Sequence, residues 1–193
     1  GERQHLRAGQ PAARRHLHTS AVTYNGYLRD DGLWDLDAEL SDTKTYATEL
    51  SEHRVEPGDP IHGMSIRVTI DEHLVIRDIA ADMHHTPHRE CPQGEDPMRR
   101  MVGTRMGPGW RQAIEKNLGG VRGCTHMREM LFNMATAAYQ TVFPHRERER
   151  RLAGAAPHLR EEPPYHLGRC IAWDFQGPLV ARMGQARVSL PGG

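Results

Sequence analysis

The period of the hydrophobic pattern changes near the middle of this chain of 193 residues, and that change sets the fold class. In the first half, apolar residues alternate with polar ones, as they do in strands that bury one face. Within 61–70, one face carries Met64, Ile66, Val68 and Ile70. After residue 97 the spacing becomes three to four, which is the period of a helix. Within 126–143, the apolar stripe is Met127, Met130, Leu131, Met134, Ala138 and Val142. The pattern predicts an α+β fold, an antiparallel β-sheet in the N-terminal half covered by a helical layer.

About four strands are expected before residue 80. The first runs from His18 to Tyr24 and is closed by a turn at Asn25-Gly26, the second spans 33–40, and 61–70 forms a hairpin with 74–79. Helices are expected over 98–102, 110–118 and 126–143, with Thr125 as the N-cap of the last and Pro144 as its end.

The rest of the chain is expected to lie outside a single domain that spans 16–143. Residues 1–15 show no hydrophobic period and are expected to form a disordered arm. Residues 144–164 are rich in Arg and Glu, then in Pro, and are interpreted as a linker. Residues 165–193 are expected to form a C-terminal hairpin, turned at residues 176–178.

Composition narrows the possible functions. Lys plus Arg and Asp plus Glu both total 25, so no net positive charge favours nucleic acid or an anionic membrane. No apolar run approaches the roughly 18–20 residues that span a bilayer. Three cysteines are an odd number and form no disulfide framework. The cytoplasm is the expected compartment.

The segment GGVRGCTHMREML (119–131) places Cys124 and His126 at the start of the long helix. A helix N-terminus lowers the pKa of a cysteine and disfavours protonated histidine, so both side chains favour their metal-binding forms there. Cys91 and His62 offer two further ligands, and a tetrahedral zinc site of these four is chemically reasonable. The alternative is that Cys124 is a small buried residue and His62 and His126 only end a strand and cap a helix.

An acidic stretch forms a second candidate site. Asp31, Asp42 and Lys44 fall within 14 residues that also hold Asp35, Asp37 and Glu39. Crowded carboxylates suit a divalent cation or a general base, and Lys44 suits an anionic substrate. An ordinary solvated strand face explains the same residues. The histidine tract at 84–88 lacks the glutamate and helical setting of a zinc-protease motif, and no phosphate-binding glycine loop or nucleophile elbow is present.

Several motifs in order resemble a bacterial family catalogued as a domain of unknown function. They are GYLRDDGLWDLDAELSDTK (26–44), PIHGM (60–64), CP (91–92), RRMVGTRMGPGW (99–110) and GGVRGCTHMREML (119–131). The resemblance covers roughly residues 14–143. The family has His-Asp-Met where this chain has His62-Gly63-Met64.

The resemblance implies a role near genes for degrading aromatic compounds and steroids. One branch is similar to the small subunit of a biotin-independent, ATP-dependent carboxylase of hydroxylated aryl ketones, which works with a larger phosphorylating partner. The first hypothesis is therefore a metal-dependent enzyme or catalytic small subunit for a small aromatic substrate. Its metal, expected to be zinc, would be held by His62, Cys91, Cys124 and His126, and His18 is a further candidate ligand. Asp31, Asp42 and Lys44 are the catalytic candidates, and Arg29 would bind an anionic cofactor.

The second hypothesis is a non-catalytic module in which zinc only stabilises the fold of a larger complex or homo-oligomer. The first hypothesis predicts that removal of the metal abolishes activity, and the second predicts that it unfolds the chain.

Overall fold

The computed structural model describes residues 12–155 and 169–188, and its centre is one antiparallel sheet in the order β1-β2-β5-β6. The strands are β1 (His18–Leu28), β2 (Trp34–Lys44), β5 (Pro60–Ile70) and β6 (Ile76–His85). A two-stranded ribbon, β3 (Thr48–Glu49) with β4 (Arg54–Val55), extends from the end where β2 stops and β5 begins. The predicted α+β class with an N-terminal antiparallel sheet is confirmed.

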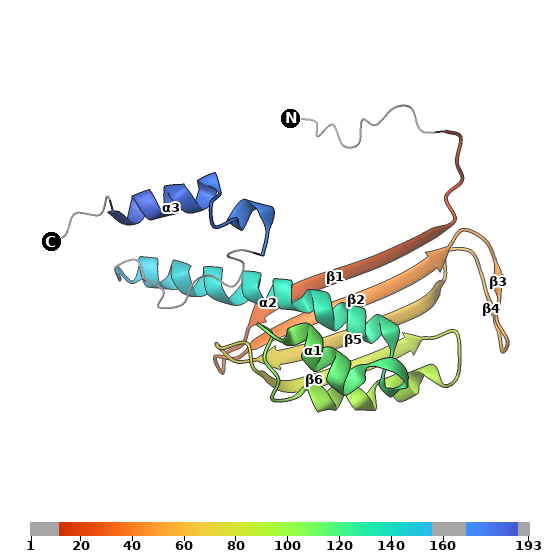
Figure 1. Ribbon diagram of the computed structural model, residues 1–193. Coiled ribbons are helices and arrows are strands. Elements are labelled where there is room, and N and C mark those ends of the chain that lie inside the picture. The colour runs from red at the N-terminus through yellow and green to blue at the C-terminus, as the bar shows by residue number, and fades with distance from the viewer. Residues whose placement is uncertain (1–11, 156–168, 189–193) are drawn as a thin grey trace.

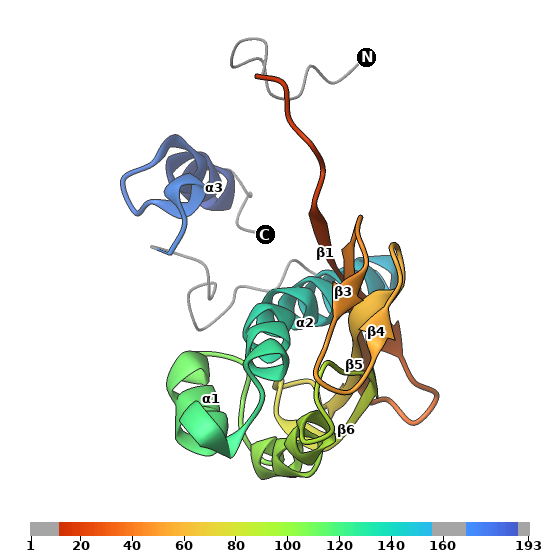
Figure 2. The same cartoon turned by 90° about the vertical axis from the view of Figure 1, so that its right-hand side faces the viewer.

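Helices cover one face of this sheet (Figures 1 and 2). They are α1 (Trp110–Leu118) and α2 (Thr125–Leu152), preceded by the short 3₁₀ turns η1 (Cys91–Gly94) and η2 (Asp96–Met101), with η3 (Gly120–Arg122) between them. The apolar stripe of α2 is fully buried against the sheet, and the Trp110 indole N–H donates to the Leu131 carbonyl at 3.0 Å. None of the helices in the described ranges has the length and apolar character that a bilayer crossing requires.

The expected turn at Asn25-Gly26 is wrong, because β1 continues through both residues to Leu28. Gly26 allows a close approach instead: a Cβ at this position would overlap the Thr141 side chain of α2. The missing side chain lets the helix pack closely on the edge strand.

The expected end of the long helix at Pro144 is also wrong. Helix α2 passes through Pro144 and ends at Leu152. Tertiary contacts offset the backbone hydrogen bond that proline cannot make. The His145 ring packs edge-on against Trp34 with centroids 5.5 Å apart, and Arg146 Nη2 lies 3.5 Å from Glu72 Oε2. The first part of the expected linker is therefore helix that packs on the sheet.

The predicted C-terminal hairpin is wrong within 169–188. This segment forms the 3₁₀ turn η4 (Ile171–Trp173) and helix α3 (Pro178–Val188). Pro178 begins α3, where its fixed φ suits the first helical turn. Other predictions for the chain ends lie outside the described residues: the arm over 1–11, the linker over 156–164, and residues 165–168 and 189–193 of the hairpin.

Candidate metal centre

An acidic residue occupies the core-facing row of β2. Alternate residues of this strand, Trp34, Leu36, Ala38 and Leu40, are buried beneath the helices. The next position in the same row is Asp42, which is only 8% exposed. A carboxylate at a core position is costly unless charged or polar partners surround it.

The strand register places the first partner, His62, directly opposite Asp42. His62 precedes Met64 in the core-facing row of β5, so both side chains point to the same face. Thr43 pairs with Pro60, so the register shifts beside this pair and Ile61 is an extra residue on β5. Such bulges redirect side chains at the ends of strands. The His62 Nδ1 atom lies 3.1 Å from Asp42 Oδ2.

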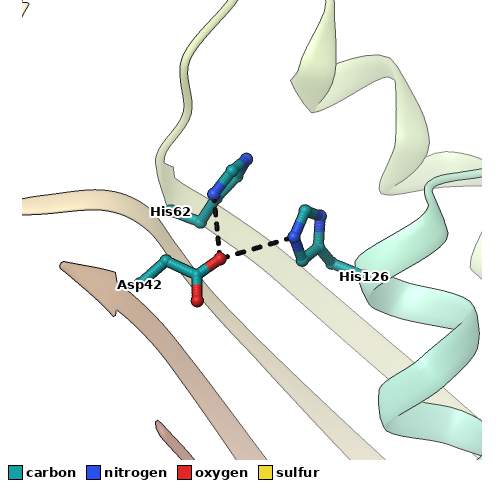
Figure 3. A group of neighbouring side chains, drawn as sticks. All are labelled: Asp42, His62 and His126. Atoms are coloured by element: carbon teal, nitrogen blue, oxygen red, sulfur yellow. Dashed lines mark ion pairs between the residues drawn. The ribbon is translucent and has the colours of Figure 1, made fainter. Parts of the chain in front are cut away.

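The second partner, His126, comes from the first turn of α2. The N-cap of this helix is Cys124 and not Thr125 as predicted, and Thr125 Oγ1 accepts a hydrogen bond from Arg128 instead. His126 Nε2 lies 3.4 Å from the same Asp42 Oδ2 atom. The centroids of the two imidazole rings lie 4.2 Å apart, and each ring turns a nitrogen toward that oxygen (Figure 3).

The geometry leaves one buried ring nitrogen without a hydrogen-bond partner. His62 Nδ1 is within ion-pair distance of Asp42, but no hydrogen bond is formed there. A buried polar atom without a partner costs free energy, and a cation between the three groups would remove that cost. Asp42, His62 and His126 each offer a ligand atom within 4.8 Å of the others.

Two distances among these atoms are close to those between the ligands of a small divalent cation. Tetrahedral bonds of 2.0–2.2 Å to nitrogen and oxygen separate neighbouring ligand atoms by about 3.3–3.6 Å. The two distances to Asp42 Oδ2 are 3.1 and 3.4 Å. Asp42, His62 and His126 therefore form a group that could hold a metal ion.

The surroundings keep Asp42 ionised. Burial raises the pKa of this carboxyl, but the Ser20 hydroxyl and electrostatic interactions with His62 and His126 outweigh burial and lower the pKa below its ordinary value. Ser20 is the β1 residue opposite Asp42. His18 Nε2 lies 3.3 Å from the other carboxylate oxygen, Oδ1. Oδ2 is the oxygen directed at His62 and His126.

The pKa values of the two histidines are shifted in opposite directions. Burial, and then the charge on His126, lowers the pKa of His62, which favours the neutral ligand form. A hydrogen bond with Cys124 raises the pKa of His126 despite burial. Burial raises the pKa of the Cys124 thiol, but its bonds with His126 and the backbone N–H groups of Met127 and His126 outweigh burial and lower the pKa. Cys124 and His126 thus act on each other electrostatically.

The structure brings together two of the four predicted ligands, His62 and His126, and keeps Cys124 next to His126. Cys91 lies in η1, whose Gly94 packs near the Cys124 Cβ, and within the described ranges Cys91 belongs to no group of metal-ligating atoms. The roles predicted for Cys91 and Cys124 stay predictions.

The remaining predicted residues are divided between the two ends of the sheet. Lys44 lies in β2 opposite His18, two residues beyond Asp42, with its ammonium 5.3 Å from the centroid of the Tyr46 ring. Arg29 and Asp31 lie in the β1–β2 turn, at the other end of β2 from Asp42. There Arg29 Nη2 pairs with Asp31 Oδ2 at 2.6 Å and Nη1 lies 3.6 Å from Asp35. Neither residue joins the centre.

Two parts of the centre were missed by sequence reasoning. Asp42 was expected to move a proton, whereas it lies among the atoms that could bind the metal. The available signal was the position of Asp42 in the alternating pattern of β2, since it continues the buried row of Leu36, Ala38 and Leu40. Ser20 carried no signal, because its role depends on the register of β1 against β2.

The comparisons assign a family to the part of the chain that contains the centre. The family described as "Protein of unknown function (DUF2889)" matches residues 18–140, from the start of β1 into α2, and this range includes all three residues of the centre. Searches of curated proteins and of solved structures found no match. The chain belongs to this family of proteins of unknown function.

Proposed function

We propose that this domain binds one divalent cation, zinc, through Asp42, His62 and His126, and that it is the metal-dependent catalytic part of an enzyme. The observation that carries the proposal is the convergence of three ligand atoms from β2, β5 and α2, where the buried His62 Nδ1 lies 3.1 Å from Asp42 Oδ2 without a hydrogen bond. Two imidazoles and one carboxylate are a common ligand set of catalytic zinc.

Three protein ligands support a catalytic site over a structural one. Structural zinc sites are closed by four protein ligands that are rich in cysteine, whereas catalytic sites keep a position for water or substrate. The His126 side chain is 30% exposed and that of His62 is 20% exposed, so the centre is reachable from solvent. The core of the fold is also built without the centre, from apolar side chains of the sheet and helices.

The residues of the chain have separate roles in this proposal. Asp42, His62 and His126 would hold the cation, which when bound supplies a Lewis acid that polarises a carbonyl oxygen. Ser20 and His18 orient the carboxylate of Asp42, and Cys124 orients the His126 ring. Lys44 would bind an anionic group of the substrate at the rim of the centre.

The substrate class and partner in this proposal come from the resemblance to the small subunit of an aryl-ketone carboxylase. A hydroxylated aromatic ketone has the carbonyl oxygen that a Lewis acid would polarise. In that arrangement a larger subunit phosphorylates the substrate with ATP and this domain handles the activated species. The alternative, an accessory module with structural zinc, predicts a different response to chelation.

Chelation separates the two functions. The full chain loaded with zinc is treated with a chelator, and its far-UV circular dichroism and thermal unfolding are recorded. A catalytic centre predicts an unchanged fold and a modest loss of melting temperature, with full loss of carboxylation by the complex with its larger partner. Unfolding on chelation would support the structural module. A chain that takes up no zinc would contradict both.

A further inference from the structure

The two edge strands of the sheet, β1 and β6, are protected to very different degrees. The outer edge of β6 is occupied by other parts of the chain. Ile76 donates its N–H to the Thr104 carbonyl at 2.9 Å and accepts from the Gly103 N–H at 2.8 Å. Near the other end, the Met83 N–H donates to the Glu95 carboxylate at 2.8 Å.

β6 also carries the usual devices against edge pairing. Its sequence includes Arg77, Asp78 and Asp82, and its register against β5 shifts twice. Charged side chains and bulges on an edge strand prevent another strand from adding to it.

β1 has none of these devices. Its eleven residues, HTSAVTYNGYL, include no Lys, Arg, Asp, Glu or Pro, and its pairing with β2 is regular over the full length. In the described part of the chain, no strand pairs with the other edge of β1. Three of its large apolar side chains are exposed: Val22 by 39%, Tyr27 by 51% and Leu28 by 50%. A long, regular, uncharged edge of this kind is a template for another strand.

We propose that this edge is where two copies of the chain associate, with β1 of one copy antiparallel to β1 of the other. The register that pairs all eleven residues places the two-fold axis at Thr23. The two sheets then become one continuous sheet of twice four strands. A symmetric contact of this type closes on itself and forms a dimer rather than a filament.

The side chains of β1 suit pairing with a second copy. In this register Thr23 faces Thr23, Val22 faces Tyr24, and Thr19 faces Tyr27. Threonine pairs and pairs of aromatic with β-branched residues are among the favourable cross-strand neighbours. The absence of charge matters most near the axis of a self-pairing, because a charge there would approach the same charge of the other copy. The strand is thus complementary to itself.

β1 is also held in place before association. The Tyr24 hydroxyl donates to the Met130 carbonyl of α2 at 3.0 Å, and Gly26 packs against Thr141. Little conformational entropy is therefore lost when a second strand adds to this edge. The inference does not depend on the metal centre, although His18 at the start of β1 would lie opposite Leu28 of the second copy.

The mass of the full chain in solution tests the inference, by size-exclusion chromatography with light scattering. We expect twice the chain mass of 21.8 kDa for the wild type. Thr23→Lys places two ammonium groups against each other at the axis and is expected to give a monomer. Ala80→Lys, an exposed substitution on the protected β6 edge, is the matched control and is expected to stay dimeric.

Two results would overturn the inference: a wild-type chain that is monomeric at its highest soluble concentration, or a Thr23→Lys variant that stays dimeric. Circular dichroism checks that each variant is folded. If Thr23→Lys does not fold, Val22→Lys replaces it, since Val22 is exposed and the two Val22 residues are diagonal neighbours across the axis. A folded Val22→Lys variant is likewise expected to be a monomer, and a dimer would overturn the inference.

Discussion

Asp42 and His62 lie directly opposite each other in β2 and β5, and Asp42 Oδ2 is 3.1 Å from His62 Nδ1. The same oxygen is 3.4 Å from His126 Nε2. His18 lies against the other carboxylate oxygen, so one oxygen of Asp42 is positioned by β1 and the other faces the two histidines. This division is what a ligand bound through a single oxygen requires. Loss of such supporting contacts typically lowers metal affinity by about 10–100-fold.

Zinc affinity should rise with pH across the neutral range. The hydrogen bond with Cys124 raises the pKa of His126, so this ring is protonated over part of that range and must lose a proton to bind zinc. Below the pKa of His126, affinity is expected to fall about tenfold per pH unit. Isothermal titration with zinc between pH 6 and pH 8 measures this slope. A flat profile would contradict the role of His126.

Cys124→Ala should move that profile to lower pH. The substitution removes the largest cause that raises the pKa of His126, so the ring becomes neutral at a lower pH. The same titration series tests the shift. Cys170→Ala is the matched control, since Cys170 is an exposed cysteine outside the centre. If Cys124→Ala instead abolishes binding at every pH, Cys124 is itself a ligand, as the sequence predicted.

Asp71 should stabilise the fold in a pH-dependent way. Its Oδ1 accepts the N–H groups of His73 and Val75 at 2.9 and 3.1 Å, and its Oδ2 accepts from Arg77 at 2.9 Å. Burial raises the pKa of Asp71, but these donors outweigh burial and lower it. The stabilisation is therefore complete above the unfolded-state pKa of about 3.9 and is lost as pH falls through the lower folded-state pKa.

Asp71→Asn should accordingly lower the free energy of unfolding at pH 7 by about 1–3 kcal/mol. Urea unfolding at a series of pH values measures the difference, which is expected to shrink below pH of about 4. Asp59→Asn, in an exposed turn, is the control and should have little effect. An Asp71→Asn difference that stays constant down to acid pH would contradict this assignment.

Gly26→Ala should destabilise the domain by about 1–3 kcal/mol through overlap with the Thr141 side chain. The neighbouring substitution Asn25→Ala is the control, because Asn25 is exposed on β1. Removing the Thr141 side chain tests whether this overlap is the cause. Thr141→Gly should lower the free energy of unfolding by less in the Gly26→Ala background than in the wild type. Urea unfolding of the four chains gives the coupling free energy. Strict additivity would show that the two positions do not interact.

Patterns with a clear local cause were predicted well. Helix α1 begins at Trp110 and ends at Leu118 as expected, and the α2 stripe from Met127 to Val142 is buried as its spacing indicated. Both follow from the helical period alone. The expected ends at Asn25-Gly26 and Pro144 failed because tertiary contacts decide them. Thr141 fills the space at Gly26, and His145 packs on Trp34 beyond the proline.

The centre was predictable only in part for a similar reason. The Cys-Thr-His segment and the His62 motif marked two of its histidines, because ligand types stand out in a sequence. Their meeting at Asp42 depends on the pairing of β2 with β5, two strands separated by the β3–β4 ribbon. A shift of one residue in that register would turn His62 away from Asp42. No local pattern specifies such a long-range register.

The zinc content of the purified chain tests the central claim most directly. The wild type, His62→Ala and the control His73→Ala, whose side chain is 72% exposed, are purified without a tag or chelator and analysed by elemental mass spectrometry. The account predicts about one zinc per chain in the wild type and in His73→Ala, and none in a folded His62→Ala chain. Equal zinc in all three chains, or no uptake by the wild type after incubation with zinc, would contradict it.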